Sequence, residues 1–324
     1  MQPPPETTPK PSPALDVVTL GEAMVLLVAE QTGPLESVQS FSKRTAGAET
    51  NVAIGLARLG LRVAWASRLG DDSMGRFLRQ AVQGEGVDCT RVRLVGGQRS
   101  GFMFKTRVTD GSDPAIEYHR KGSAASLMEA SDLDRQWLAS ARHLHVTGVF
   151  PALTASTLAL SHASIDVMRS AGGSVSFDPN LRPALWPSTA VMRREINALA
   201  LRADWVLPGL EEGRLLTGGD SPQAIARFYR DAGVGLVVVK LGADGAYFDG
   251  TDGCGHLPAA AVETVVDTVG AGDGFAVGLI SALLQGRSVA EATARGAWIG
   301  ARAVQVVGDT EGLPTLRELQ AARL

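Results

Sequence analysis

The sequence predicts an α/β protein, in which helices flank a mainly parallel sheet. Two observations favour this class. From residue 48 onward, helical patterns of apolar residues alternate with short β-branched runs, as expected of successive strand–helix–strand units. Compact apolar runs bounded by Gly, Pro, Asp or Asn have the form of strands buried on both faces of a sheet. We expect four such runs to form the centre of the sheet, at residues 142–146, 174–177, 204–207 and 236–240.

The first part of the chain supplies the remaining elements. Residues 1–14 are rich in proline and lack an apolar stretch, so we expect a disordered tail rather than a signal peptide. The apolar run at 15–29 is interrupted by Asp16, Gly21 and Glu22, which favours two short strands over a membrane span. Apolar residues then predict a helix that ends before Gly60, and a strand and a second helix should follow at 62–66 and 75–83.

Two stretches break the alternation of helices and strands. They lie at about 31–45 and 97–122, and the second contains alternating apolar positions before a polar turn at 109–114. We expect their strands to lie outside the main sheet. No repeat of roughly 20 to 50 residues is visible, which argues against a solenoid or a propeller. Residues 15–324 are therefore expected to form one α/β domain with a small β appendage.

Composition narrows the class of partner. The 324 residues carry 31 Lys and Arg against 34 Asp and Glu, a net charge of -3, so no overall positive field attracts nucleic acid or an anionic membrane. A small molecule is the expected partner. Cys89 and Cys254 show no metal-binding spacing, so we expect two free thiols and a cytoplasmic protein.

The strongest local signal is a glycine-rich turn at 265–275, between an apolar strand and an apolar helix. Free N–H groups in the first helical turn and the helix dipole favour a bound anion, and Gly270 and Gly272 place no side chain in its way. Asp273 should then lie beside that anion, where a carboxylate can accept a proton from an attacking hydroxyl. Alternatively, Asp273 stabilises only the start of the helix.

Other nucleotide-binding motifs can be excluded. The chain contains no Gly-x-x-x-x-Gly-Lys-Ser/Thr motif, and the glycines at 270, 272 and 274 lack the final spacing of Gly-x-Gly-x-x-Gly. These differences argue against a P-loop protein and against a dinucleotide-dependent dehydrogenase.

Asp-Thr-Val-Gly-Ala-Gly-Asp at 267–273 resembles the second signature of the PfkB, or ribokinase-like, carbohydrate kinases. Residues 46–60, beginning Ala-Gly-Ala-Glu-Thr-Asn, resemble the first signature, and 70–75 resemble a further turn of the family. The resemblance covers roughly residues 15–320 and implies a ribokinase-like, doubly wound sheet with a β lid. It also implies transfer of the γ-phosphoryl group of ATP, with Mg²⁺, to a sugar hydroxyl.

The resemblance assigns roles by position. It implies that Gly270, Ala271 and Gly272 form the anion hole, that Asp273 is the base, and that the sugar meets the segment containing Gly47, Ala48, Glu49 and Asn51. The residue types agree, because glycine allows close approach of the backbone and an amide both donates and accepts hydrogen bonds. Asn51 could instead be only a helix cap.

On the nucleotide side, Lys240 with Gly242 and Gly245 resembles the family's turn near the ATP phosphates. Glu212 matches a glutamate that holds Mg²⁺ through water, although Gly209 stands where the family often has Asn. Mg²⁺ retains several waters, so one carboxylate with ATP phosphates can suffice. A monovalent cation is a further cofactor compatible with this family.

Two arginines, Arg120 and Arg182, favour a sugar acid as the substrate, because a guanidinium matches a carboxylate bidentately. The segments at 47–51 and 118–124 resemble 2-keto-3-deoxygluconate kinases, which implies substrate contacts by Tyr118, Arg120, Arg182 and Asp309. Met103 departs from a lid tyrosine found in some relatives.

The expected product is the 6-phosphate of 2-keto-3-deoxy-D-gluconate. A fructokinase or a ribokinase-type enzyme is the alternative within the family, and a non-catalytic sugar or nucleotide sensor is an alternative of another class. The resemblance also implies a homo-oligomer, a dimer formed through the lid.

Overall fold

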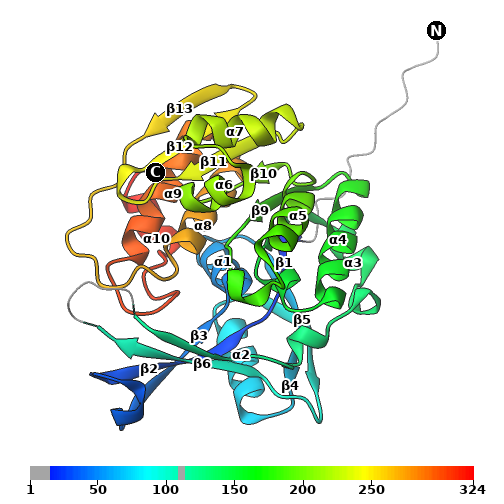
Figure 1. The fold of residues 1–324 in the computed structure, drawn as a ribbon, viewed down its shortest axis with the longest axis vertical. Coiled ribbons are helices and arrows are strands. Elements are labelled where there is room, and N and C mark those ends of the chain that lie inside the picture. Colours follow the sequence, from blue (N-terminus) through cyan, green and yellow to red (C-terminus); the bar gives the residue numbers. More distant parts are fainter. Residues whose placement is uncertain (1–14, 109–113) are drawn as a thin grey trace.

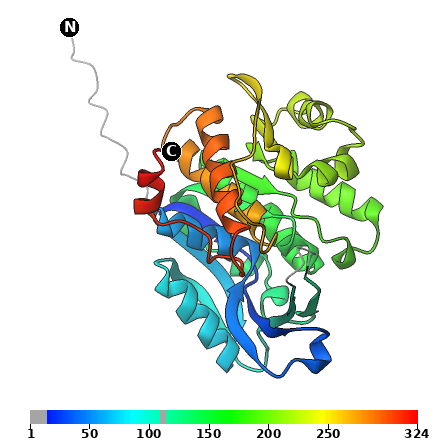
Figure 2. The ribbon, with the colours of Figure 1, turned by 90° about the vertical axis from the view of Figure 1, so that its left-hand side faces the viewer.

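The computed structural model describes residues 15–108 and 114–324. The expected tail at 1–14 and the core of the expected turn, residues 109–113, lie outside the described residues. Figures 1 and 2 show a main body with a sheet between two layers of helices, and a second, smaller sheet at one end of the molecule. The α/β class is thus confirmed.

The main sheet has nine strands in the order β13-β12-β11-β10-β9-β8-β1-β4-β5. Neighbouring strands from β11 to β5 pair in parallel, whereas β12 and β13 pair in antiparallel at one edge. The four runs predicted for the centre all lie in this sheet. Its strands are β1 (Leu15–Leu20), β4 (Val63–Gly70), β5 (Asp88–Val95), β8 (Ala141–Thr147), β9 (Ser174–Asp178), β10 (Trp205–Val206), β11 (Leu236–Lys240), β12 (Ala246–Gly250) and β13 (Gly253–Leu257).

The order of the strands reverses beside β1. The chain first adds β4 and β5 on one side of β1, and then returns to place β8 and the later strands on the other side. The sheet is therefore doubly wound. In such sheets ligands bind beyond the carboxyl ends of the strands, near the point of reversal. A ligand is therefore expected at the loops that follow β1, β8, β9 and β11.

Alternation along the strands builds two cores. In β1, Val17 contributes to the core on one face and Val18 to the core on the other. The first face is covered by α1 (Ala48–Arg58), α2 (Ser73–Gly84), α8 (Ala271–Leu284), α9 (Val289–Ala303) and α10 (Leu316–Ala321). The second face is covered by α3 (Arg135–Ala139), α4 (Ala155–Ser170), α5 (Thr189–Ala200), α6 (Leu210–Thr217) and α7 (Pro222–Asp231).

The second sheet has the order β3-β2-β6-β7. It differs from the range expected from the sequence, because it begins at Met24 rather than near residue 31: the chain leaves the main sheet at the short turn after Leu20. One face of this sheet carries a small apolar cluster that includes Met24 and Met103. Its strands are β2 (Met24–Thr32), β3 (Phe41–Ala46), β6 (Gly101–Arg107) and β7 (Ile116–His119).

Two further expectations concern the whole chain. Both cysteines are free, Cys89 in the interior and Cys254 at the surface, as predicted. Within 15–108 and 114–324, no helix is long and apolar enough to cross a membrane.

Candidate active site

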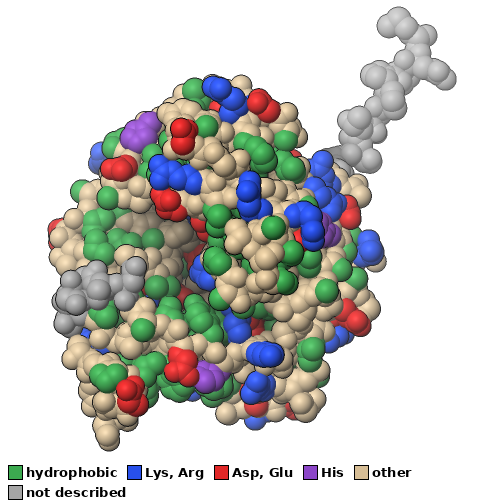
Figure 3. Space-filling model, viewed as in Figure 1, with side chains coloured by type: hydrophobic (Ala, Val, Ile, Leu, Met, Phe, Trp, Pro, Cys, Tyr) green, Lys and Arg blue, Asp and Glu red, His purple; other side chains and the backbone are tan. Residues whose placement is uncertain are grey.

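A cavity of about 550 Å³ lies between the second sheet and the carboxyl ends of the main sheet. Figure 3 shows the surface hollowed there. Its walls come from the loops after β1, β8 and β9, the end of β11, the start of α8 and the inner face of the second sheet. Most of the site residues expected from the sequence line it: Gly47, Ala48, Asn51, Tyr118, Arg120, Arg182, Glu212, Lys240, Gly270, Gly272, Asp273 and Asp309.

The glycine-rich turn forms one end of this cavity. Gly270 has φ +84°, and a Cβ there would lie 2.7 Å from the backbone oxygen of Asp309, so only glycine fits without strain. The first hydrogen bond within α8 runs from Gly274 N–H to Gly270 O, which leaves the preceding amides of the helix start for an anion. A Cβ on Gly272 would approach Lys240 Nζ to 3.3 Å, so the ammonium lies beside the same turn. These residues fit a phosphate group.

Lys240 is itself held in place. Its Nζ lies 2.6 Å from Asp178 Oδ2, and Asp178 is buried at the end of β9. Burial opposes the charge of this lysine, but the neighbouring carboxylates of Asp178, Glu212 and Asp273 raise the pKa of Lys240 overall. The ammonium therefore stays charged beside the turn.

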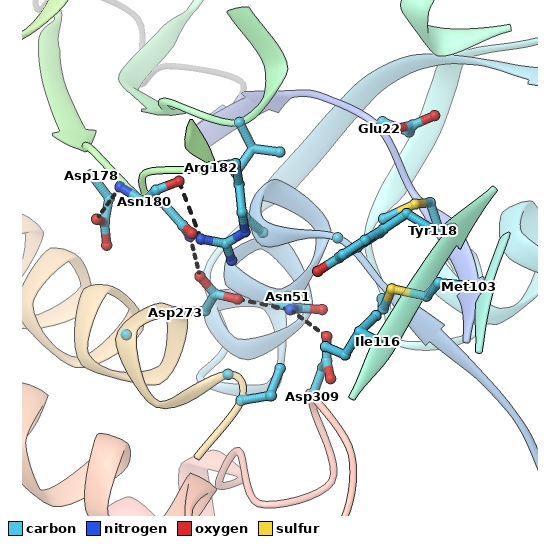
Figure 4. A pocket seen from close by; sticks show the side chains of 18 of the residues that line it. Glu22, Asn51, Met103, Ile116, Tyr118, Asp178, Asn180, Arg182, Asp273 and Asp309 are labelled. Atoms are coloured by element: carbon cyan, nitrogen blue, oxygen red, sulfur yellow. Dashed lines mark hydrogen bonds between the residues drawn. The ribbon is translucent and has the colours of Figure 1, made fainter. Parts of the chain in front are cut away.

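Asp273 lies at the meeting point of two amides. Asn51 Nδ2 donates to Asp273 Oδ2 over 2.8 Å, and Asn180 Nδ2 donates to Oδ1 over 3.3 Å. Burial, together with the charges of Asp178 and Asp309, raises the pKa of Asp273 to about 7, against the opposing effects of the Asn51 hydrogen bond and Lys240. A carboxylate with a pKa near neutrality is suited to accept a proton from a hydroxyl. Figure 4 shows the Asp273 carboxylate in direct hydrogen-bond contact with Asn51 and Asn180, so its contacts extend beyond the helix start.

A second carboxylate lies on the other side of Asn51. Asn51 Nδ2 is 3.4 Å from Asp309 Oδ2, and burial raises the pKa of Asp309 to about 6. In the described part of the chain, Asn51 Oδ1 and Asp309 Oδ1 are buried oxygens without a hydrogen-bond partner. Buried polar atoms are seldom left so. Hydroxyl groups of a ligand in the cavity could supply the missing donors.

The two arginines differ in their surroundings. Arg120 is buried, and its Nε and Nη2 lie 2.7 and 2.6 Å from Glu22 Oε2, so that carboxylate already balances its charge. Arg182 donates from Nη1 to the backbone oxygen of Leu181 over 2.9 Å, and no ion pair joins it to a carboxylate in the described residues. Figure 4 shows Arg182, Tyr118 and Asp273 pointing toward one space. Arg182 is thus an exposed cation of the cavity wall that has no carboxylate partner in the described residues.

The lining residues that were missing from the expected set include Glu22, Asp178 and Asn180. Each follows or ends a parallel strand, so the rule that ligands bind at carboxyl ends could have identified them. Asn180 also has φ +38°, which is uncommon for a residue with a side chain. This conformation accompanies the amide's contact with Asp273.

Glu49, which was expected to meet the sugar, does not line the cavity, and a contact of its side chain with substrate stays a prediction. Glu49 belongs to the first turn of α1, and its side chain is buried, where Thr147 Oγ1 donates to Oε1 over 2.6 Å. Burial raises the pKa of Glu49 to about 7. Helical geometry is the reason, because Glu49 points to a different side of α1 from Ala48 and Asn51.

Ala271, Gly242 and Gly245 do not line the cavity either. The two glycines shape the turn after β11, with φ +60° and +92°. A Cβ on Gly245 would lie 2.0 Å from Leu257 O, so contact with the end of β13 is enough to require glycine there. A contact of these residues with nucleotide stays a prediction.

The expected metal ligand, Glu212, lies in the cavity wall. Its Oε1 accepts from Leu181 N–H over 2.7 Å and its Oε2 from Gly209 N–H over 2.8 Å. In the described residues no group of three or more His, Cys, Asp or Glu side chains could hold a metal ion. A divalent ion would therefore depend on phosphate oxygens and water besides this carboxylate.

Comparisons with known proteins agree with this geometry. The family model for "pfkB family carbohydrate kinase" matches residues 14–316. The chain is 48% identical to the 2-dehydro-3-deoxygluconokinase of Bacillus subtilis, with 94% of each chain covered. Among solved structures, a PfkB protein from Polaromonas sp. JS666 superposes with a TM-score of 0.89 at 63% identity, covering 95% of this chain and all of that one (100%). A ribokinase-like protein from E. coli, solved with ATP and Mg²⁺, superposes with a TM-score of 0.88 at 25% identity, covering 95% and 98%.

Proposed function

The chain belongs to the pfkB family of carbohydrate kinases and is an ATP-dependent sugar kinase, and we propose that its substrate is 2-keto-3-deoxy-D-gluconate. The observation that carries the proposal is the state of Arg182, a guanidinium in the cavity wall with no carboxylate partner in the described chain. Arg182 is exposed in the free protein, and a sugar acid would supply a counter-charge for its guanidinium, which a neutral sugar would not. The relative from Bacillus subtilis supports the same substrate.

In the proposed reaction, Arg182 binds the substrate carboxylate. Tyr118, and the part of Arg120 that lines the cavity, lie near the bound carboxylate. Asn51 and Asp309 orient the hydroxyl groups. Asp273 accepts the proton of the terminal hydroxyl as its oxygen forms a bond to the γ-phosphorus. The bond from that phosphorus to the β–γ bridging oxygen breaks, and ADP leaves with the electron pair.

The rest of the site stabilises charge. We propose that Lys240 and the amides around Gly270 and Gly272 bind the ATP phosphates and hold the negative charge of the transferred group. Mg²⁺ would arrive with ATP and supply further positive charge, and Glu212 is the residue that we propose to hold it through water. The second sheet would serve as a lid that excludes water from the cavity.

We expect activity to depend on the ionisation of Asp273. Because its pKa is raised to about 7, the base is protonated and inactive at low pH. Log kcat/KM for the sugar should therefore rise with a slope of about 1 up to roughly pH 7 and level off above it. Initial rates at saturating Mg·ATP between about pH 5.5 and 9 would measure this, with Mg·AMP-PNP affinity at each pH as the control. A flat profile across that range would exclude Asp273 as a base of this pKa.

A sugar panel in a coupled ADP-release assay tests the substrate. We expect kcat/KM for 2-keto-3-deoxy-D-gluconate to exceed that for D-fructose and D-ribose by about 100-fold, the contribution of a charge-assisted hydrogen-bonded pair. Faster turnover of a neutral sugar would favour the fructokinase or ribokinase alternative. Saturable sugar binding without ADP release would favour the sensor.

We propose, in addition, that two copies pair through the outer face of the second sheet. Half-buried rings gather on the face turned away from the cavity: Phe102, which also packs against the first core, stacks on His119 with ring centroids 4.6 Å apart, and Phe104 contacts Phe41 and Phe102. Such a face, beside open strand edges, favours association. Sedimentation equilibrium should give twice the 33.9 kDa chain mass. A monomer at micromolar concentration would contradict this.

We place the reaction in the cytoplasm. It consumes ATP, and the two free thiols suit a reducing compartment.

A further inference from the structure

A buried ion pair lies just outside the cavity, and the reaction described above does not use it. Lys105, in the middle of β6, is 2% exposed, and its Nζ lies 2.5 Å from Asp267 Oδ2. Asp267 is 5% exposed. Lysine is almost never fully buried unless it is paired, and the charge of each partner here depends on the other.

The carboxylate of Asp267 connects three segments that are distant in sequence. Besides the bond from Lys105 on the second sheet, its Oδ1 accepts from Val269 N–H over 3.1 Å, within the glycine-rich turn. Its Oδ2 accepts from Gly308 N–H over 3.2 Å, next to Asp309. The pair thus ties the second sheet, the phosphate-binding turn and the Asp309 loop to one another.

The charge of this pair matters for anion binding. Asp267 lies three residues before Gly270, so an unbalanced negative charge on it would oppose a phosphate at the amides of the turn. Water can screen little of that charge, because both partners are buried. The ammonium of Lys105 cancels it. The same ammonium also lowers the pKa of Asp309, against the larger effect of burial.

We propose that Lys105 is a positioning residue for the nucleotide: its buried ammonium neutralises Asp267, and so keeps the 268–272 turn in place and attractive to phosphate. The proposal rests on the proposed function only in taking the bound anion to be an ATP phosphate. It also means that the second sheet contributes to the nucleotide site, although Lys105 touches no part of that site's surface.

Isothermal titration with Mg·AMP-PNP, without sugar, tests the role of the charge. The variants are Lys105→Met, Asp267→Asn and the double variant. Lys43→Met is the matched control, at an exposed lysine on strand β3 of the same sheet. We expect Lys105→Met to raise Kd at least about tenfold, because it leaves the Asp267 charge beside the turn. Adding Asp267→Asn should bring Kd back to within roughly threefold of the wild type, as a coupled pair requires. Lys43→Met should leave Kd unchanged.

Two results would overturn the proposal: an unchanged Kd in Lys105→Met, or a double variant that binds as weakly as Lys105→Met, since loss of packing alone is not repaired by Asp267→Asn. If Lys105→Met does not fold, as judged by circular dichroism, the double variant decides the matter. It should fold and bind within about threefold of the wild type, and tenfold weaker binding would contradict the proposal. Failure of the wild type to bind Mg·AMP-PNP would count against the kinase assignment instead.

Discussion

Asp273→Asn is expected to reduce kcat by about three orders of magnitude, while the Kd for Mg·AMP-PNP stays within a few fold of the wild type. The reason is that an amide cannot accept the proton, whereas the amides of the turn and Lys240 remain in place. The new side chain can be accommodated. Asn51 has an unpartnered Oδ1, and once the Asn51 amide group has flipped, this oxygen can accept a hydrogen bond from the introduced amide. Single-turnover rates with radiolabelled ATP and calorimetric binding would measure the two effects separately.

The same variant should become more stable at neutral pH. The pKa of Asp273 is raised to about 7 in the folded protein, against an ordinary value of 3.8. Between these two pH values the folded state therefore binds more protons than the unfolded state. Stability from this group is present at low pH and is lost as pH rises through that window. Removing the buried charge should therefore raise Tm above pH 7. Near-normal kcat in this variant would exclude Asp273 as the base, and a lower Tm would contradict the account of its environment.

Arg182→Ala is expected to raise KM for the sugar acid by about 100-fold and to change KM for any accepted neutral sugar by less than about threefold. Its guanidinium is the cavity cation without a carboxylate partner in the described residues, so the substrate carboxylate depends on it. Arg182→Lys is the matched control, because it keeps the charge but loses the planar fork. Its KM for the sugar acid should lie between those of the wild type and Arg182→Ala. Initial rates over a range of sugar concentrations would measure the series.

An equal change in KM for charged and neutral sugars in Arg182→Ala would show that Arg182 does not recognise a carboxylate. Arg120→Ala is a poorer test, because it would leave Glu22 buried without its partner and destabilise the fold at the same time.

The features that the sequence could predict are local. The turn around Gly270 and the position of Asp273 follow from a glycine pattern between a strand and a helix, and the α/β class follows from alternation along the chain. The family resemblance supplied Asn51 and Asp309, whose distant segments the fold brings together at Asp273.

What could not be predicted depends on tertiary packing. The sequence suggested that both arginines were free to bind a carboxylate. In the folded chain Arg120 pairs with Glu22, which lies 98 positions away in the sequence, so only Arg182 remains without such a partner in the described residues. Glu49 looked like its neighbours in the first signature, yet the helix turns it toward Thr147. Lys105 carried no signal, because an alternating strand places a charged side chain inward without revealing that a partner lies there.

The central claim is that this cavity transfers phosphate to the terminal hydroxyl of a sugar acid. A competition experiment tests it most directly: the wild-type enzyme receives limiting ATP with equal concentrations of 2-keto-3-deoxy-D-gluconate and D-fructose, and ³¹P and ¹³C NMR identify the esters formed. We expect nearly all of the phosphate, about 99% at a 100-fold preference, on O6 of the sugar acid. A product consisting mainly of fructose phosphate, or of free phosphate, would contradict the claim.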